Sequence, residues 1–475
     1  MANRPLWTVQ ELVAATGGAL RGEVRGPING VSIDSRAVNP GDVFVAIKGD
    51  KMDGHDFVVG ALKVGAGVAV VSRPTDEMRA AGAILQVASD PLYGLENMGR
   101  AAREWCAGQI IAITGSVGKT STKEMLRTAL STSGQTHASA ASFNNHWGVP
   151  LTLSRLPRDA AYGVFEIGMN HVGEITPLVK MVRPNIAIIT IVAASHLGNF
   201  NSLDEIALAK AEIFSGLEKG GTAIINQDSP YFDLLKAAAK AGGAKSIIGF
   251  GRHANADVRL ERVALHPTCC CITADVMGER VTYKLGMPGE HMALNSLAVL
   301  AAVKAAGADL ARAMLALADA APAKGRGVQE RFVTNGGEFL LIDESYNANP
   351  TSIGAALALL HQAKTAKNGR RIAVLGDMLE LGPSGPQLHA DLAKAVDEHR
   401  VDVIYAAGPL MRHLWDALPK TKQGAYARSS SELNDQLLGQ LRAGDAVMVK
   451  GSLGSKMGLV VEALRKKFAV VEKDS

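Results

Sequence analysis

The sequence predicts an α/β fold of three domains: a small N-terminal α/β domain, a central domain with a mostly parallel sheet, and a C-terminal α/β domain. Two observations lead to this prediction. First, 475 residues exceed what one hydrophobic core can hold. Second, short apolar segments alternate with helical patterns from residue 108 onwards, as in parallel sheets that are covered by helices.

The first domain, residues 1–107, contains strand-like segments between turns that carry glycine and proline. The clearest are Val43–Ile47 and Val68–Val71. The N-terminal segment lacks the continuous apolar stretch of a signal peptide and predicts an amphipathic helix instead. No apolar run approaches the ~18 residues of a membrane span, so we expect no membrane insertion.

The second and third domains, residues 108–322 and 323–475, repeat a strand–helix pattern. Their boundary lies where Pro322 and two glycines interrupt a long alanine-rich helix. The third domain has the pattern of a Rossmann-like sheet. The predicted strands are Gln109–Thr114, Tyr162–Ile167, Ile186–Ala193 and Thr222–Asn226 in the second domain, and Phe339–Asp343, Arg371–Leu375, Val403–Ala407 and Ala446–Lys450 in the third.

Charge and cysteine usage exclude several classes of partner and site. A net charge of +4, without blocks of like charge, argues against a nucleic-acid partner. The cysteines are Cys106 and the run Cys269, Cys270 and Cys271. Adjacent side chains of an extended segment point to opposite faces, and no CxxC pair suggests zinc. We therefore expect reduced core thiols in a cytoplasmic protein.

The segment IIAITGSVGKTSTKEML has the pattern of a phosphate-binding loop between a strand and a helix, and not of an ordinary turn. Gly115 and Gly118 let backbone N–H groups turn toward an anion, and a helix that opens at Lys119 adds its positive end. Lys119 can reach the outer phosphates, and the Thr120 hydroxyl can bind Mg²⁺. The predicted ATP-binding residues are Thr114, Gly115, Ser116, Val117, Gly118, Lys119 and Thr120, with Mg²⁺ beside them.

The loop departs from the general pattern, because Ile113 stands where the first glycine is expected. The shortened form T-G-S-V-G-K-T resembles that of the Mur ligase and folylpolyglutamate synthetase superfamily. Its members activate a carboxylate with ATP and join it to an amine. The resemblance implies a catalytic role for Lys119, in a site where metal ions and cationic side chains bring two anions together.

Glu166 and His196 follow strands at the edge of the sheet that carries the loop. A lone glutamate or histidine at a strand end is more often a solvated loop residue. Two of them beside a phosphate loop favour metal binding. The resemblance implies that Glu166 and His196 are catalytic and that each holds a Mg²⁺ ion.

Lys210 stands on the buried face of the helix SLDEIALAKAEIFSGL, which we expect to begin with a capping box of Ser202 and Glu205. Such a lysine ordinarily keeps its ammonium in water at the end of its long stem. A desolvated lysine loses its proton readily and can then react with CO₂ to form a carbamate. The resemblance implies a catalytic carboxylysine at Lys210 that helps to place the second Mg²⁺.

Three further residues resemble nucleotide contacts of the superfamily. In MPGEHMALNSLAVLAA, His291 and Asn295 lie on one helix face, and the superfamily uses such an asparagine against adenine. Arg326 resembles the arginine that crosses from the C-terminal domain to the phosphates. Asp343 resembles the acid that faces the ribose. Each has a plain alternative as a surface loop residue.

The segment VSIDSRAVNPGDVFVAIKG, followed by DGHDF, resembles the N-terminal uridine-nucleotide domain of Mur ligases. Ser35 and Arg36 come just after a strand, where backbone amides and a guanidinium are exposed to a uridine or diphosphate. The alternative is a structural strand followed by a β-turn at residues 39–42.

Three segments, SFNNHWGVPLT, FEIGMNHVGEI and DESYNANPTSI, resemble the family member that adds D-alanyl-D-alanine. The resemblance implies two small-molecule substrates, UDP-N-acetylmuramoyl-tripeptide and D-Ala-D-Ala. The tripeptide ends in diaminopimelate or lysine. The implied contacts are Asn144 and Asn145 for the uridine substrate, and Asn170, Tyr346, Asn347 and Asn349 for the dipeptide.

Two rival functions stay open at this stage. Another ligase of the superfamily would add diaminopimelate or lysine, or glutamate to folate, but the N-terminal domain and the absence of a D-N-P-R motif argue against them. A phosphate-loop NTPase that acts as a switch would need neither a uridine domain nor a buried Lys210. We expect a monomeric ligase whose third domain closes over ATP.

Overall fold

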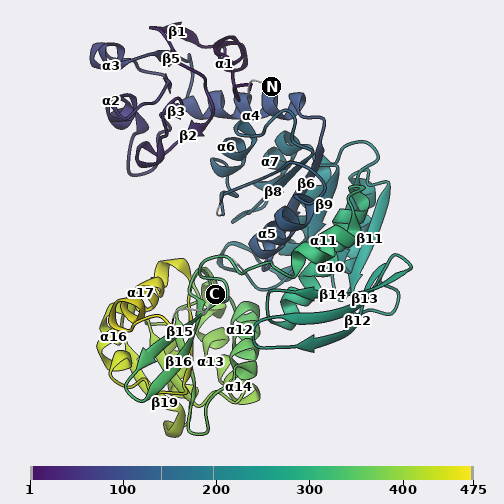
Figure 1. Ribbon diagram of the computed structural model, residues 1–475, viewed down its shortest axis with the longest axis vertical. Coiled ribbons are helices and arrows are strands. Elements are labelled where there is room, and N and C mark those ends of the chain that lie inside the picture. Colours follow the sequence, from purple (N-terminus) through teal and green to yellow (C-terminus); the bar gives the residue numbers. More distant parts are fainter. Residues whose placement is uncertain (1–3, 141, 196, 472–475) are drawn as a thin grey trace.

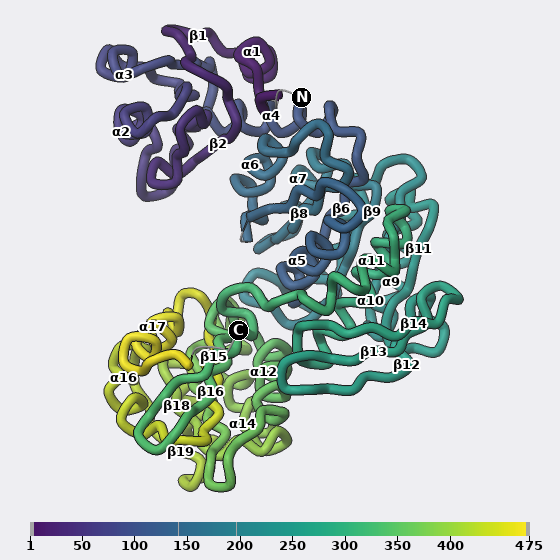
Figure 2. Tube along the Cα trace, in the orientation of Figure 1, coloured from purple at the N-terminus to yellow at the C-terminus, as the bar shows by residue number. Residues whose placement is uncertain are grey.

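The computed structural model describes residues 4–140, 142–195 and 197–471 and arranges them as three α/β bodies along a bent long axis (Figure 1). Each body has its own sheet, so the predicted fold class is confirmed. Figure 2 follows the chain from the N-terminal body through the central one to the C-terminal one. Among the helices of these residues, none is both long and apolar enough to cross a bilayer.

The N-terminal sheet has five strands in the order β1-β5-β4-β3-β2, all parallel except β1. The predicted amphipathic helix is α1, which opens with a capping box of Thr8 and Glu11. The elements are α1 (Val9–Thr16), β1 (Ala19–Arg21), β2 (Val31–Ser32), β3 (Val43–Val45), α2 (Val58–Lys63), β4 (Val68–Val71), α3 (Asp76–Ala81) and β5 (Ile84–Gln86).

Helix α4 (Pro91–Trp105) leads from the first body into the second and packs against helices of both. Direct hydrogen bonds also cross this first junction, among them one from Arg158 to Glu11. The Trp7 Nε1–H donates to the carbonyl of Ser154 at 2.8 Å, and Arg155 Nε donates to the carbonyl of Val31 at 2.6 Å. Because a buried indole N–H without its acceptor would be costly, these bonds fix how the two bodies meet.

The central sheet has nine strands in the order β14-β13-β12-β11-β10-β9-β6-β8-β7. Strands β7 to β12 pair in parallel, and β12, β13 and β14 form an antiparallel extension. The mostly parallel sheet is therefore confirmed. Its strands are β6 (Gln109–Thr114), β7 (Thr136–Ala138), β8 (Tyr162–Glu166), β9 (Ile186–Ile189), β10 (Thr222–Asn226), β11 (Ser246–Gly251), β12 (Val258–Leu265), β13 (Cys270–Val276) and β14 (Glu279–Leu285).

Helices cover both faces of the central sheet. Apolar residues of α5, α10 and α11 pack on one face, and those of α4, α6, α7 and α8 pack on the other. The predicted single alanine-rich helix is two helices, because the chain turns at Gly307 with a φ of 70°. The helices are α5 (Lys119–Leu130), α6 (Gly148–Ser154), α7 (Ile175–Val182), α8 (Leu203–Ala211), α9 (Phe232–Ala241), α10 (Glu290–Ala305) and α11 (Leu310–Leu317).

All four cysteines are free thiols, as expected, but only two of them lie in a core. Cys106 and Cys270 are buried, whereas Cys269 is partly exposed and Cys271 is exposed. The expectation of core thiols was therefore wrong for the last two. Cys271 follows Cys270 in strand β13 and consequently points to the opposite, solvent-facing side of the sheet.

The C-terminal sheet has six strands in the order β15-β16-β20-β17-β18-β19, parallel except for β15. Apolar clusters fill both of its faces. The elements are β15 (Val328–Thr334), β16 (Gly337–Glu344), α12 (Pro350–Gln362), β17 (Arg371–Gly376), α13 (Gly385–Ala390), α14 (Leu392–Glu398), β18 (Val403–Ala407), α15 (Met411–Ala417), β19 (Gln423–Ala427), α16 (Ser430–Leu438), β20 (Ala446–Lys450) and α17 (Gly458–Lys467).

Candidate active site

A cavity lies between the central and C-terminal bodies, where the phosphate loop of one faces the ends of β16 and β20 of the other. Carboxyl ends of parallel strands are where open α/β sheets bind ligands. Many of the predicted site residues meet here although they come from distant parts of the chain. Those that line the cavity are Ser116, Val117, Gly118, Lys119, Thr120, Asn144, Glu166, Asn170, Asn295, Arg326, Tyr346, Asn347 and Asn349.

The phosphate loop has a backbone that two glycines make possible. Gly115 and Gly118 have φ values of 151° and 88°, and α5 begins at Lys119 directly after them. The Lys119 ammonium donates to the carbonyl of Gly115 at 2.7 Å. Burial lowers the pKa of Lys119, while the charge of Glu166 opposes that shift. The loop therefore holds a half-buried cation at the positive end of a helix, which suits a phosphate.

The chain after β9 supports this loop, which the sequence did not indicate. Strand β9 ends at Ile189, four residues earlier than predicted. The Thr190 hydroxyl donates to the carbonyl of Val117 at 2.6 Å, and the Ser116 hydroxyl donates to the carbonyl of Ala193 at 2.8 Å. The loop is thus tied to the neighbouring strand end before any ligand arrives.

Glu166 is buried at the end of β8 and is held by two donors. Its carboxylate accepts from the Thr120 hydroxyl at 2.9 Å and from the Asn144 side-chain amide at 2.7 Å. Among the residues that the structure describes, no three His, Cys, Asp or Glu side chains gather as a metal site. One carboxylate and one hydroxyl next to a phosphate loop nevertheless fit Mg²⁺, which prefers few protein ligands and completes its shell with phosphate and water.

Lys210 of α8 is 2% exposed, and its ammonium has no hydrogen-bond or ion-pair partner among the described residues. Burial, and then the nearby charge of Lys119, lower its pKa well below the ordinary value. The neutral amine that a carbamate requires is therefore favoured. Lys210 does not itself line the cavity. His196 lies outside the described residues.

The cap of α8 differs from the predicted capping box. The backbone N–H of Glu205 donates to the Ser202 hydroxyl at 3.1 Å, as expected. The Glu205 carboxylate, however, accepts from the backbone and side chain of Asn201, at 2.7 and 3.0 Å, instead of returning to Ser202. Only the hydrogen bond to the Ser202 hydroxyl forms, because the Glu205 carboxylate is occupied by the two N–H donors of Asn201.

Arg326 reaches the central body from the start of the C-terminal one. Its guanidinium donates to the Ser142 hydroxyl at 3.3 Å, and the same hydroxyl lies 3.3 Å from that of Thr120. The guanidinium also stacks over the ring of Tyr346 at 4.2 Å, which holds its plane in place. The third body therefore brings a cation to the phosphate loop.

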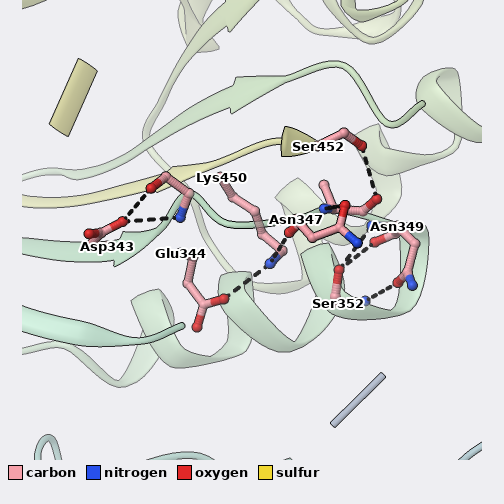
Figure 3. Close-up of polar contacts among 9 residues, drawn as sticks. Asp343, Glu344, Asn347, Asn349, Ser352, Lys450 and Ser452 are labelled. Carbon is pink, nitrogen blue, oxygen red and sulfur yellow. Dashed lines mark hydrogen bonds and ion pairs between the residues drawn. The ribbon is translucent and has the colours of Figure 1, made fainter. Parts of the chain in front are cut away.

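The two acids that end β16 have different surroundings (Figure 3). Asp343 accepts from the backbone N–H and the hydroxyl of Ser345, at 3.1 and 2.6 Å, and pairs with Arg465 at 3.3 Å. It does not line the cavity. Glu344, in contrast, lines the cavity, and its carboxylate forms an ion pair of 3.0 Å with Lys450.

Sequence reasoning missed Glu344 and Lys450. They are register partners at the ends of β16 and β20, and Lys450 also donates to the carbonyl of Asn347 at 2.9 Å. The signal in the sequence was a lysine directly after the apolar strand VMV. Asn349, predicted to lie near a substrate, uses its side-chain oxygen to cap α12 by accepting from the N–H of Ser352 at 2.8 Å.

The remaining predicted residues lie away from this cavity. Thr114 and Gly115 stand just behind the loop, and Asn145 accepts from the backbone N–H of Gly148 at the start of α6. Ser35 and Arg36 belong to a short turn of the N-terminal body, where the Arg36 guanidinium pairs with Asp34 at 2.8 Å and is largely exposed. Ser35 and Arg36 therefore belong to a separate surface, whereas Asn144, which is also predicted to contact the uridine substrate, lines the cavity.

A second hollow opens beside Lys119 between the same two bodies. Its lining includes Asn347 of the C-terminal body, and Ser195 of the central body contributes a buried hydroxyl that has no partner among the described residues. Next to it, the backbone N–H of Gly198 donates across the junction to the carbonyl of Glu380 at 2.8 Å. The hollow thus offers polar groups close to the phosphate loop.

This arrangement defines a class: an enzyme that binds nucleotide on a phosphate loop and covers it with a further domain. Family models identify the class more narrowly. The catalytic domain of the Mur ligase family matches residues 27–99, the Mur ligase middle domain matches 113–303, and the Mur ligase glutamate ligase domain matches 330–453. The chain belongs to the Mur ligase family.

Individual relatives cover nearly the whole chain. The UDP-N-acetylmuramoyl-tripeptide–D-alanyl-D-alanine ligase of Rickettsia prowazekii is 32% identical over 96% of this chain and 99% of its own length. A crystal structure of MurF from Acinetobacter baumannii is 34% identical, with a TM-score of 0.83 over 97% of this chain and 99% of that chain. The MurF ligase of Thermotoga maritima in complex with ADP is 26% identical, with a TM-score of 0.75 over 92% and 97%.

Proposed function

We propose that this chain is an ATP-dependent ligase that joins D-alanyl-D-alanine to UDP-N-acetylmuramoyl-tripeptide, a step in making peptidoglycan precursors. The observation that carries the proposal is the shared cavity of the phosphate loop, Glu166 and Arg326. This cavity belongs to a chain that matches ligases named for this activity along almost its full length. The earlier rival, a nucleotide switch, does not explain three Mur ligase domains in one chain.

The reaction has two steps. The terminal carboxylate of the tripeptide attacks the γ-phosphorus of ATP, and an acyl phosphate forms as the bond to ADP breaks. The amine of D-Ala-D-Ala then attacks the acyl carbon, loses a proton, and phosphate leaves. Lys119 and Arg326 bring positive charge to the phosphates, which lowers the repulsion between the two anions.

We place Mg²⁺ at Thr120 and Glu166, with His196 and a carbamate on Lys210 as further ligands. The Thr120 hydroxyl and the Glu166 carboxylate already lie 2.9 Å apart. The metal, when bound, supplies charge neutralisation at the transferring phosphoryl group. The buried amine of Lys210 supports the carbamate assignment, because no anionic partner of it is found among the residues that the structure describes.

The substrates would enter from two sides. The uridine substrate would extend from the N-terminal body toward the phosphate loop. Its contacts would be Ser35, Arg36, Asn144 and Asn145. Asn170, Tyr346, Asn347 and Asn349 would hold the dipeptide near the second hollow. ATP would be held by residues Thr114 to Thr120 and by Asn295. We further propose that the enzyme is a monomer of the cytoplasm, and that its domains comprise residues 1–107, 108–322 and 323–475.

One assay tests the function. Phosphate release is measured with ATP, Mg²⁺ and UDP-N-acetylmuramoyl-tripeptide, with D-Ala-D-Ala, lysine or diaminopimelate as the acceptor. We expect release only with the dipeptide, and a product whose mass equals both substrates less one water. A parallel reaction with the uridine dipeptide substrate and lysine or diaminopimelate tests the rival ligase. Release that ignores D-Ala-D-Ala would refute the proposal.

A further inference from the structure

Helix α7 follows the loop of residues 167–174, here named the β8–α7 loop, and begins without a cap of its own. Its N-cap residue is Glu174, whose side chain makes no capping hydrogen bond. The cap comes from another segment instead. The Glu212 carboxylate accepts from the backbone N–H and the hydroxyl of Thr176, at 3.0 and 2.9 Å. A carboxylate also suits the positive end of a helix, so Glu212 stabilises the start of α7.

The same carboxylate holds the β8–α7 loop. Its other oxygen accepts from the backbone N–H of Gly173 at 2.6 Å. The beginning of the loop is held by the N–H of Gly168, which donates to the carbonyl of Asn144 at 2.8 Å. In its middle, the N–H of Asn170 donates to the Glu174 carboxylate at 2.7 Å. The backbone is thus anchored along the loop, and Asn170 lines the cavity.

Glu212 belongs to the same helical segment as Lys210. Lys210 lies in the last turn of α8, and the 3₁₀ helix η4 (Glu212–Gly216) follows α8 directly. This segment packs closely on α7, since a Cβ added at Gly216 would lie 2.4 Å from the carbonyl oxygen of Val179. Glu212 therefore links the helix that carries Lys210 to the β8–α7 loop.

A second carboxylate joins the same two segments at the other end of α7. Glu218 accepts from the Nε–H of Arg183, the residue that caps the end of α7, at 2.7 Å. Their side chains are 33% and 45% exposed, and neither residue lines the cavity. Exposed ion pairs of this kind contribute little to stability. Glu218 is therefore a matched control, because it contacts α7 but not the loop.

We propose that Glu212 is a positioning residue, which holds the β8–α7 loop so that Asn170 meets the acceptor dipeptide in a fixed place. This inference rests on the proposed function, in which Asn170 contacts D-Ala-D-Ala. A fixed group binds a substrate more tightly than a mobile one, because less conformational freedom is lost on binding. Glu212 acts through the loop and lies outside the lining of both hollows.

The kinetic test is a double-mutant cycle of Glu212→Gln and Asn170→Ala. A glutamine offers one acceptor oxygen in place of two and turns an NH₂ group toward backbone donors. We expect Glu212→Gln to raise the KM for D-Ala-D-Ala by about 10-fold, as for lost hydrogen bonds to a charged group. Asn170→Ala should raise it similarly. The double variant should be no worse than the weaker single variant, because both changes remove the same contact.

Two further variants complete the kinetic test. Glu218→Gln should leave the KM for D-Ala-D-Ala unchanged, both alone and together with Asn170→Ala. Thr176→Val keeps the Glu212 carboxylate but removes one of its donors, so it should raise that KM by less than Glu212→Gln does. It replaces Glu212→Gln in the cycle if thermal unfolding shows that the glutamine variant does not fold.

Hydrogen exchange measures the anchoring without any ligase reaction. A peptide that spans residues 168–176 should exchange faster in Glu212→Gln than in the wild type, and at the wild-type rate in Glu218→Gln. Unchanged exchange in folded Glu212→Gln would overturn the proposal. So would additive losses in the cycle, or an unchanged KM in Asn170→Ala. A wild-type protein that forms no product with D-Ala-D-Ala would refute the proposed function, and the exchange rates would still decide whether Glu212 orders the loop.

Discussion

At the scale of single residues, Lys210 has the least favourable surroundings. Its ammonium is buried near a second ammonium, that of Lys119, and no described acid compensates it. The folded-state pKa is therefore lowered, so at pH values between it and the ordinary pKa of 10.5 the unfolded chain binds more protons than the folded one. Unmodified Lys210 therefore destabilises the folded protein at neutral pH. This destabilisation becomes smaller as the pH rises toward the pKa of Lys210 in the unfolded chain. The surroundings of Lys210 therefore suit the carbamate chemistry proposed for it and do not stabilise the fold.

We predict that Lys210→Met lowers ligase activity by about 100-fold or more while raising the unfolding temperature. The loss would follow from removal of the proposed metal-placing group, and the gain from removal of a buried amine that has to lose its proton on folding. Both are measured at pH 7.5, activity with Mg²⁺ and unfolding without it. Lys180→Met, at an exposed position of α7, is the control and should change neither. A destabilised Lys210→Met protein would contradict the account.

At the scale of single residues, the sequence predicted some side chains of the candidate site but not all of them. The loop, Glu166 and Lys210 were found because each carries a local pattern of strand end, glycine or helix period. The choice between Asp343 and Glu344 has no local signal. It depends on Arg465, which lies 122 residues further along the chain and draws Asp343 away from the cavity.

At the scale of elements, the phosphate loop depends on close contact with the end of β9. A Cβ added at Gly115 would lie 1.9 Å from the Thr190 hydroxyl, which is itself bonded to the carbonyl of Val117. The parallel strands themselves were predictable, since buried strands are continuous apolar runs. The ends of these strands were harder to predict. Residues 190–193 continue the apolar run of β9, but they leave the sheet and hold Ser116.

We predict that Gly115→Ala weakens ATP binding by about 10-fold or more, because the methyl group displaces Thr190 and opens the loop, a cost of at least ~1 kcal/mol. Equilibrium binding of a fluorescent ATP analogue measures this. The matched control is Gly220→Ala, where φ is 85° and nothing lies within 4 Å of the added Cβ. It carries backbone strain without the clash, so equal losses of affinity in both variants would contradict the mechanism.

At the scale of the whole molecule, the two junctions are built differently. The first has α4, a buried side-chain hydrogen bond through Trp7 and a partly buried one through Arg155. The second has the Arg326–Ser142 contact, a hydrogen bond from the Gln329 side chain to the carbonyl of Pro267, and a backbone contact of Gly198 with Glu380, where Gly198 and Gly382 touch. The chain crosses this junction between α11 and β15 in a segment without helix or strand, so we expect the C-terminal body to move and the N-terminal body to stay with the central one.

We predict that Gly198→Val lowers kcat by about 10-fold or more with little change in unfolding temperature, because the side chain wedges the closed junction apart. A Cβ at this position already lies 3.1 Å from the backbone nitrogen of Gly382. Small-angle X-ray scattering with nucleotide should show a larger radius of gyration than for the wild type. Gly60→Val, on an open face of α2, serves as the control. Normal compaction of the Gly198 variant would rule out this account.

The first junction also has a pharmacological consequence. A cleft whose walls move during turnover presents an inhibitor with several shapes, and a compound fitted to one of them loses affinity for the others. We expect the surface between the N-terminal and central bodies to keep one shape, since Trp7 and Arg155 anchor it on both sides. A rigid molecule designed against that surface would meet the same walls at every stage of the catalytic cycle.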